Sequence, residues 1–283
     1  MKKLLLVDGN SLINRAFYAT TLTNGATYGF LNMFLREIQD VAPTHVAVAF
    51  DVRAKTFRHQ MFDGYKVHRK PMPDDLARQL FDLKDLLAIM GVKMFEKAGF
   101  EADDIIGTLA TLAGKHGFHT LILTSDRDLL QLVTDTTEVC LTKVGVSKTE
   151  IWDTTRIAKE YGVVPKQLVD IKALMGDKSD NIPGAPGIGE KTAVKLIKEF
   201  VNVVAAVDAI EKLHEHRDII LKSRDLAQIK CDIEMPFDVD ALAFTLPLDK
   251  PVFDAFKSRG FSSLCNRADL FKNTNIPVQQ SFF

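Results

Sequence analysis

Residues 4–13, LLLVDGNSLI, place an acidic side chain directly after a strand-like apolar run. The same pattern returns in VAVAFD at 46–51 and in LILTSD at 121–126. Short apolar runs that alternate with helical patterns predict an α/β fold, with a mainly parallel sheet flanked by helices. The carboxyl ends of parallel strands line one crevice, where ligands bind. We therefore expect Asp8, Asp51 and Asp126 to lie close together.

The expected elements follow from apolar periodicity and from turn residues. Strands are predicted at 3–7, 45–50, 92–95, 119–124 and 137–141. Helices are predicted at 11–19, 28–40, 73–90, 102–115, 154–161, 165–174, 203–212 and 215–229. This order gives a sheet-containing first part and a helical second part.

Nine carboxylates stand at the boundaries of these predicted elements. Each can be explained singly as a helix cap or a turn residue, so the prediction depends on the set. Like charges gathered in one crevice must hold either protons or hard cations, and Mg²⁺ prefers oxygen ligands. The sequence therefore indicates metal-assisted phosphoryl chemistry. The nine are Asp8, Asp51, Glu101, Asp103, Asp104, Asp126, Asp128, Asp177 and Asp180.

The bulk composition is that of an ordinary globular protein with a formal net charge of −1. If the nine acids bind cations, the rest of the chain carries eight more basic than acidic side chains, which is consistent with nucleic-acid binding. Three widely spaced cysteines favour a reducing cytoplasm over a disulfide framework. No apolar run is long enough to span a bilayer, and Asp8 interrupts the first one too early for a signal peptide.

Two further stretches are typical of phosphate binding. The segment between Asp51 and the helix predicted at 73–90 is basic and carries aromatic residues. A solvated charged face is the plain alternative, but cations with aromatics suit a single strand that passes a metal site. The stretch PGIGEKTAVKLI at 186–197 places Gly187 and Gly189 before a lysine-bearing helix. This pattern is typical of a helix-hairpin-helix that binds the DNA backbone without reading bases.

These stretches together resemble the 5′ nuclease family of flap endonucleases, and most of all the 5′→3′ exonuclease domain of bacterial DNA polymerase I and its free-standing relatives. The resemblance runs through LLLVDGNSLINRAFYA, VAFDVRAKTFRHQMFDGYKVHRKPMPDDL, FEADDIIGTLA, LTSDRDLLQLV and ALMGDKSDNIPGAPGIGEKTA, over most of residues 4–200. It implies a PIN-like mixed sheet, a helical arch over the active site and a helix-hairpin-helix. The expected parts are a nuclease core at 1–180 with the arch at about 53–90, a helix-hairpin-helix subdomain at 181–270, and a tail at 271–283.

The resemblance also implies roles for single residues. One Mg²⁺ or Mn²⁺ would be held by Asp8, Asp51, Glu101 and Asp103. A second would be held by Asp126, Asp128 and Asp180, with Asp104 and Asp177 in support. Lys66 and Arg69 would contact the scissile phosphate at the base of the arch. Further DNA contacts would come from Arg58, Tyr65, Gly187, Gly189, Lys191 and Thr192. Backbone carbonyls around Gly184, Gly187 and Gly189 would hold K⁺.

The implied function is hydrolysis of DNA near a 5′ end, as exonuclease and flap endonuclease, by a monomer in a bacterial cytoplasm, in replication and repair. Substrates would carry a 5′ flap, a nick or a 5′ end. The last residues, with Gln279, Ser281, Phe282 and Phe283, resemble a short sliding-clamp-binding peptide. Two alternatives remain open at this point: a DNA-binding module without catalysis, and an acidic-site nuclease that acts on RNA.

Overall fold

A six-stranded sheet forms the centre of the molecule. The computed structural model describes residues 2–143, 149–246 and 248–267 of the chain. The strands are β1 (Lys2–Asp8), β2 (His45–Ala49), β3 (Lys93–Phe95), β4 (Phe118–Thr124), β5 (Thr137–Thr142) and β6 (Thr149–Trp152), in the order β3-β2-β1-β4-β5-β6. All neighbouring pairs are parallel except β5 and β6. The predicted mixed, mainly parallel sheet is confirmed, although the sequence analysis missed β6.

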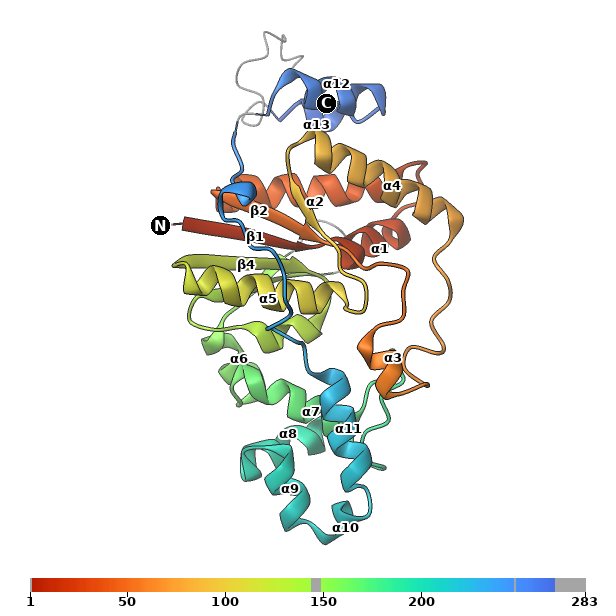
Figure 1. Ribbon diagram of the computed structural model, residues 1–283, viewed down its shortest axis with the longest axis vertical. Helices are drawn as coiled ribbons and strands as arrows, with labels where there is room; N and C mark the ends of the chain where they lie inside the picture. Colours follow the sequence, from red (N-terminus) through yellow and green to blue (C-terminus); the bar gives the residue numbers. More distant parts are fainter. Residues whose placement is uncertain (1, 144–148, 247, 268–283) are drawn as a thin grey trace.

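Helices cover both faces of this sheet (Figure 1). On one face α1 (Gly9–Ala19), α2 (Gly25–Val41) and α4 (Asp74–Ile89) pack on Leu5 and Val7 of β1. On the other face α5 (Ala102–Lys115) packs on Leu4 and Leu6. Side chains alternate across a strand, so a central strand that is buried on both faces reads as a continuous apolar run.

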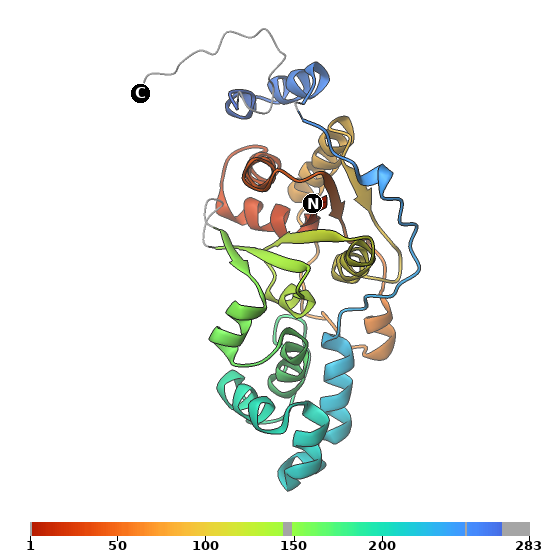
Figure 2. The same ribbon diagram turned by 90° about the vertical axis from the view of Figure 1, so that its left-hand side faces the viewer.

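A second group of helices lies beside the sheet, at the lower end of the molecule in Figure 2. It consists of α7 (Leu168–Met175), α8 (Glu190–Phe200), α9 (Val203–Ala209), α10 (Glu211–His214) and α11 (Arg217–Ala227), with a core of its own. That core starts at Val163, before the expected boundary at 180/181. The helical core begins earlier because α7 buries Ile171, Ala173 and Leu174 against the following helices and not against the sheet.

The chain then returns to the sheet, which also differs from the expected subdomain at 181–270. Ile229, Ile233 and Leu242 join the core on the α5 face. The helices α12 (Lys250–Ser258) and α13 (Ser262–Cys265) pack with α2 and α4 on the opposite face, at the top of Figure 1. The second group of helices therefore ends with α11 at Ala227. The remaining elements are α6 (Thr154–Tyr161), η1 (Arg127–Leu132), η2 (Pro165–Gln167) and η3 (Asp240–Leu242).

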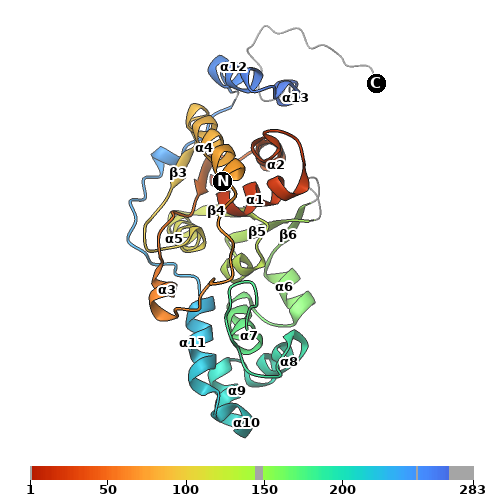
Figure 3. The same cartoon turned by 90° about the vertical axis from the view of Figure 1, so that its right-hand side faces the viewer.

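The segment expected as a helical arch is only partly helical. It contains the short helix α3 (Phe57–Met61), then turns and irregular backbone up to α4. Figure 3 shows α3 beside α11, and the contacts agree, since Met61 and Phe62 pack with Leu226 and Ala227. Among the described residues, no helix is long and apolar enough to cross a membrane.

Candidate active site

The carboxyl ends of β1, β2 and β4 deliver acids to one cavity, as the strand pattern predicted. Asp8 ends β1, and Asp51 and Asp126 each lie two residues beyond the end of a strand. The cavity has a volume of about 970 Å³. Its acidic lining residues are Asp8, Asp51, Glu101, Asp103, Asp126 and Asp180. Six of the nine candidate acids therefore share one cavity.

Asp8 is a buried acid that lines this cavity. Its Oδ1 accepts a hydrogen bond from the Ser11 backbone N–H at 3.0 Å, which caps α1, and its Oδ2 accepts one from the Thr124 hydroxyl at 2.7 Å. Burial, together with the charges of Asp126 and Asp51, outweighs these bonds and raises the pKa of Asp8 to about 7. The two oxygens are thus fixed by one donor from the first turn of α1 and one from the last residue of β4.

Asp51 and Asp103 complete this part of the site. The Asp51 backbone N–H donates to Asn10 Oδ1 at 2.9 Å, and Asp51 Oδ1 accepts from the Ala102 N–H at the start of α5 at 2.7 Å. Burial raises the pKa of Asp51. Burial and the charges of Asp126 and Asp8 raise the pKa of Asp103 well above its usual range.

This donor set fits hard divalent cations. It offers carboxylate oxygens whose mutual repulsion opposes full ionisation, and a bound cation would reverse that balance. Oxygen-only ligands of this kind suit Mg²⁺ or Mn²⁺ and not a soft metal. The acids could therefore share two or more ions.

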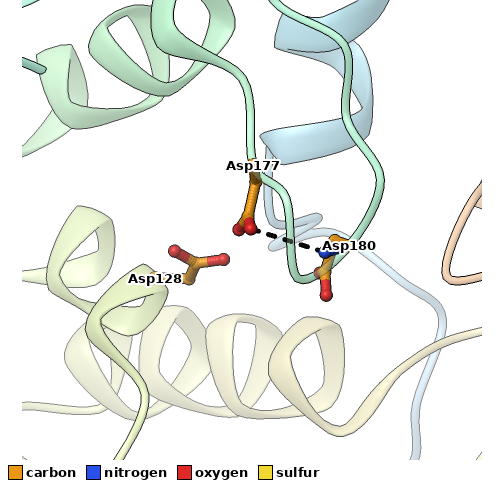
Figure 4. Close-up of side chains that lie close together, drawn as sticks. All are labelled: Asp128, Asp177 and Asp180. Carbon is orange, nitrogen blue, oxygen red and sulfur yellow. Dashed lines mark hydrogen bonds between the residues drawn. The ribbon is translucent and has the colours of Figure 1, made fainter. Parts of the chain in front are cut away.

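A second acidic cluster adjoins the first. It consists of Asp128 on η1 and of Asp177 and Asp180 on the loop after α7 (Figure 4). Each of the three offers one carboxylate oxygen, and these oxygens lie within 4.8 Å of one another. Asp180 belongs to both clusters. The resemblance had placed Asp177 in support and Asp126 in this second set. In the structure Asp177 is a full member of the triad, and Asp126 lies near enough to Asp8 and Asp103 to raise their pKa values.

Basic side chains from the arch segment reach the same acids. Lys66 Nζ lies 2.7 Å from Glu101 Oε1 and 3.8 Å from Asp180 Oδ2, and Arg69 Nη2 lies 2.6 Å from Asp180 Oδ1. Lys66 has φ of 54°, a conformation uncommon outside glycine. It is held there because its N–H donates to the Asp180 carbonyl at 2.9 Å. Lys66 and Arg69 thus line the same cavity as the acids.

Three residues expected in the site are turned into the protein instead. Arg58 and Asp104 form a buried pair, with Nη1–Oδ2 and Nη2–Oδ1 distances of 2.7 and 2.9 Å. Asp104 also accepts from the backbone N–H groups of Glu101 and Lys230, so its oxygens are fully used. In this structure Arg58 and Asp104 therefore bind each other, and neither is among the residues that line the cavity. A phosphate contact of Arg58 and a metal contact of Asp104 stay predictions.

Tyr65 is likewise turned into the protein. Its side chain is buried, and its hydroxyl donates to Glu101 at 3.1 Å and to Asp180 at 3.3 Å. Burial and these acids raise its pKa, so the hydroxyl stays protonated. Tyr65 positions the two carboxylates and offers no surface on which a base could stack.

The predicted hairpin connects α7 and α8. Gly184 and Gly187 have φ of 66° and 76°, and Gly189 is the N-cap of α8. A side chain at Gly184 would overlap the Gly176 backbone nitrogen, only 2.3 Å from the Cβ position. Lys191 and Thr192 lie exposed on the first turn of α8. The hairpin thus presents backbone and a lysine to solvent, while the predicted clamp motif at 279–283 lies outside the described residues.

Sequence reasoning missed the residues that hold the acids in place. Lys172 on α7 forms ion pairs with both Asp128 and Asp177, and Thr124 and Asn10 position Asp8 and Asp51. Thr124 and Asn10 stand beside predicted strand ends, which was an available signal. Lys172 stands on α7, five residues before Asp177 on the following loop, and this spacing gives no such signal.

The comparisons with known proteins agree with this architecture. Residues 3–162 match the family model for the 5′-3′ exonuclease N-terminal resolvase-like domain, and residues 163–250 match the one for the 5′-3′ exonuclease C-terminal SAM fold. The chain belongs to the 5′-3′ exonuclease family. The boundary between the two models coincides with the start of the helical core at Val163.

Relatives in this family include both short and long proteins. The chain is 39% identical over 269 residues to a 5′-3′ exonuclease of Bacillus subtilis, with 88% of this chain and 90% of that protein covered. It is 41% identical over 282 residues to DNA polymerase I of the same organism, covering 94% of this chain. The chain spans about a third, 32%, of that polymerase.

A solved structure shows the same fold at lower identity. It is a bacteriophage T5 flap endonuclease in a complex with DNA and metal ions, with a TM-score of 0.67 and 22% identity. The similarity covers 93% of this chain and 95% of that one.

Proposed function

We propose that this chain hydrolyses phosphodiester bonds of DNA near a 5′ end, both as a 5′→3′ exonuclease and as a 5′-flap endonuclease. The observation that carries the proposal is the convergence of six acids in one cavity under the basic pair Lys66 and Arg69. A pure DNA-binding module gains nothing from acids that face phosphate. The family membership and the DNA complex of the T5 relative support DNA as the substrate.

Two or more divalent cations, Mg²⁺ or Mn²⁺, would be held by the two acidic clusters. When bound, such ions polarise the phosphate, activate water and stabilise the leaving oxygen. Asp8, Asp51, Glu101 and Asp103 would hold the first. Asp128, Asp177 and Asp180 would hold the second, with Asp126 between the clusters.

The chain's own residues supply positioning and charge. Lys66 and Arg69 would place positive charge where negative charge develops on the phosphate, a contribution worth about 10²–10³ in rate for a single preorganised donor. Thr124 and Asn10 keep Asp8 and Asp51 oriented through fixed hydrogen bonds. The last nucleotide must unpair to reach the acids, at a cost of a few kcal/mol.

The hairpin would hold the duplex by its backbone. The N–H groups near Gly187 and Gly189 and the exposed Lys191 and Thr192 suit a phosphate. Carbonyls around Gly184, Gly187 and Gly189 would hold K⁺ between hairpin and phosphate. Measuring flap-DNA affinity in K⁺ and in Li⁺ at equal ionic strength tests this part, because a specific K⁺ site predicts tighter binding in K⁺.

A monomer in a bacterial cytoplasm, active in replication and repair, remains the expected form of the protein. Its three cysteines are free thiols, which supports a reducing compartment. The motif of Gln279, Ser281, Phe282 and Phe283 supports binding to a sliding clamp. Deleting 279–283 should abolish capture by the clamp and leave cleavage of free flap DNA intact, whereas unchanged capture removes this part of the proposal.

The nuclease function is tested with a labelled 5′-flap DNA, with and without Mg²⁺. Cleavage should require the ion, and Asp103→Asn and Asp126→Asn should each nearly eliminate it while DNA remains bound. Asp232→Asn, an exposed acid outside both clusters, serves as the matched control. Full turnover in both site variants would overturn the proposal. An RNA–DNA hybrid and single-stranded RNA in the same assay decide whether RNA is also cleaved.

A further inference from the structure

Lys172 is a partly buried cation inside the second acidic cluster. Its side chain is 15% exposed. Its Nζ lies 2.5 Å from Asp177 Oδ2 and also forms an ion pair with Asp128 Oδ2. One ammonium group thus connects two of the three carboxylates that could hold an ion there.

The oxygens that Lys172 contacts are the ones a metal ion would need. The other oxygen of Asp177, Oδ1, accepts hydrogen bonds from the Ser179 backbone N–H at 2.7 Å and from its hydroxyl at 2.6 Å. These bonds shape the loop that carries Asp180, so Oδ1 is committed to the fold. Asp177 Oδ2 remains for a cation, and Lys172 occupies it.

The first cluster has fewer paired acids than the second. In the second cluster each of the three acids forms an ion pair, Asp128 and Asp177 with Lys172 and Asp180 with Arg69. In the first cluster Glu101 pairs with Lys66, whereas the salt bridges of the described part of the chain include none to Asp8, Asp51 or Asp103. A divalent ion would therefore relieve more repulsion in the first cluster than in the second.

We propose that Lys172 is a positioning residue that competes with the divalent ion of the second cluster and so weakens that site relative to the first. The inference rests on the proposed function, in which both clusters bind divalent ions. Entry of an ion between Asp128 and Asp177 requires the Lys172 ammonium to move off their oxygens. The two sites therefore fill in order, the first cluster before the second.

The test is a Mn²⁺ titration of the full chain without DNA, followed by the electron paramagnetic resonance signal of free Mn²⁺. The wild-type protein should show one tighter and one weaker class of site. Lys172→Met should strengthen the weaker class about 10- to 100-fold, the range in which neighbours of metal ligands change affinity. Lys172→Gln, which keeps a hydrogen-bonding group but no charge, should act in the same direction.

Two controls separate competition from a general charge effect. Lys172→Arg retains the positive charge and should leave the weaker class unchanged. Lys178→Met removes one positive charge from the same loop at an exposed position and should also leave it unchanged. Thermal unfolding provides a second readout. Lys172→Met should lower the Tm without Mg²⁺, and adding Mg²⁺ should raise the Tm of this variant more than that of the wild type.

Unchanged or weaker Mn²⁺ binding in Lys172→Met and Lys172→Gln would overturn the proposal, as would equal affinities of the two classes in the wild type. A strengthening of the same size in Lys178→Met would also overturn it, because long-range charge would then explain the effect. Failure of the proposed nuclease mechanism is a separate result. Full cleavage by the Asp103→Asn variant would show it, whatever the titrations of the Lys172 variants show.

Discussion

Breaking the Arg58–Asp104 pair should unfold the protein more readily without removing a DNA contact. The Arg58 side chain is 3% exposed and that of Asp104 is 0% exposed. Arg58 also donates to the carbonyls of Leu226 and Gln228, at 2.9 Å each. The pair therefore ties α3, the start of α5 and the end of α11 to one another.

The expected cost follows from these contacts. Arg58→Met removes two charge-assisted bonds to Asp104 and two bonds to carbonyls, and it leaves a carboxylate buried without its cation. Removing one partner of such a buried pair costs roughly 3–5 kcal/mol. The double variant Arg58→Met/Asp104→Leu removes both charges and should recover a large part of that loss, since two apolar side chains replace an ion pair at smaller cost.

Urea unfolding followed by circular dichroism measures both values, and flap-DNA binding at a temperature where the variant is folded provides the functional readout. We expect wild-type DNA affinity in folded Arg58→Met. A cost below about 1 kcal/mol, the range of an exposed salt bridge, would refute the structural role. A large loss of DNA affinity in a variant of wild-type stability would instead support the predicted contact between Arg58 and a DNA phosphate.

Three further outcomes follow from the site and the core. Lys66→Met should slow flap cleavage by about 10²-fold or more while DNA still binds, as measured by single-turnover kinetics. Gly184→Ala should cost more stability in urea unfolding than Gly187→Ala. Both glycines have positive φ, where a side chain costs about 1–2 kcal/mol. Of the two, only Gly184 would bring a Cβ against the backbone, 2.3 Å from the Gly176 nitrogen. Burial raises the pKa of Glu37, so its contribution to stability falls as the pH rises from its unfolded-state value through the folded one. The free energy of unfolding of Glu37→Gln, relative to that of the wild type, should therefore be higher at pH 8 than at pH 4. Urea unfolding at both pH values measures this difference.

Each of these has a result that contradicts it. Unaltered single-turnover rates in Lys66→Met would remove its transition-state role. Equal costs at Gly184 and Gly187 would mean that the close approach to Gly176 is not restrictive. A pH-independent difference between Glu37→Gln and the wild type would show that burial does not shift this carboxyl.

The acids at strand ends could be predicted from the sequence because parallel topology fixes their meeting place. Asp8, Asp51 and Asp126 each follow an apolar run, and the rule that joins such positions needs no knowledge of side-chain packing. The hairpin was equally accessible, since Gly184 and Gly187 occupy positions whose φ suits glycine.

The remaining features depend on partners that are distant in sequence. Arg58 looked like a phosphate contact because it stands in a basic segment, but its acceptor carbonyl on Leu226 is 168 positions away. The same holds for Tyr65, whose hydroxyl reaches Asp180. Whether a charged or aromatic side chain faces solvent or protein is decided by such contacts, and local pattern does not carry them.

The triad of Asp128, Asp177 and Asp180 crosses the seam between the two family models, which meet at residues 162 and 163. The part of the chain matched by each model contributes carboxylates to this one triad, so neither part contains the complete triad by itself. A chimaera that joined one half of this chain to the other half of a distant relative would need matching acids on both sides of the join. Recombination between such modules is therefore constrained by chemistry, even where the backbones superimpose.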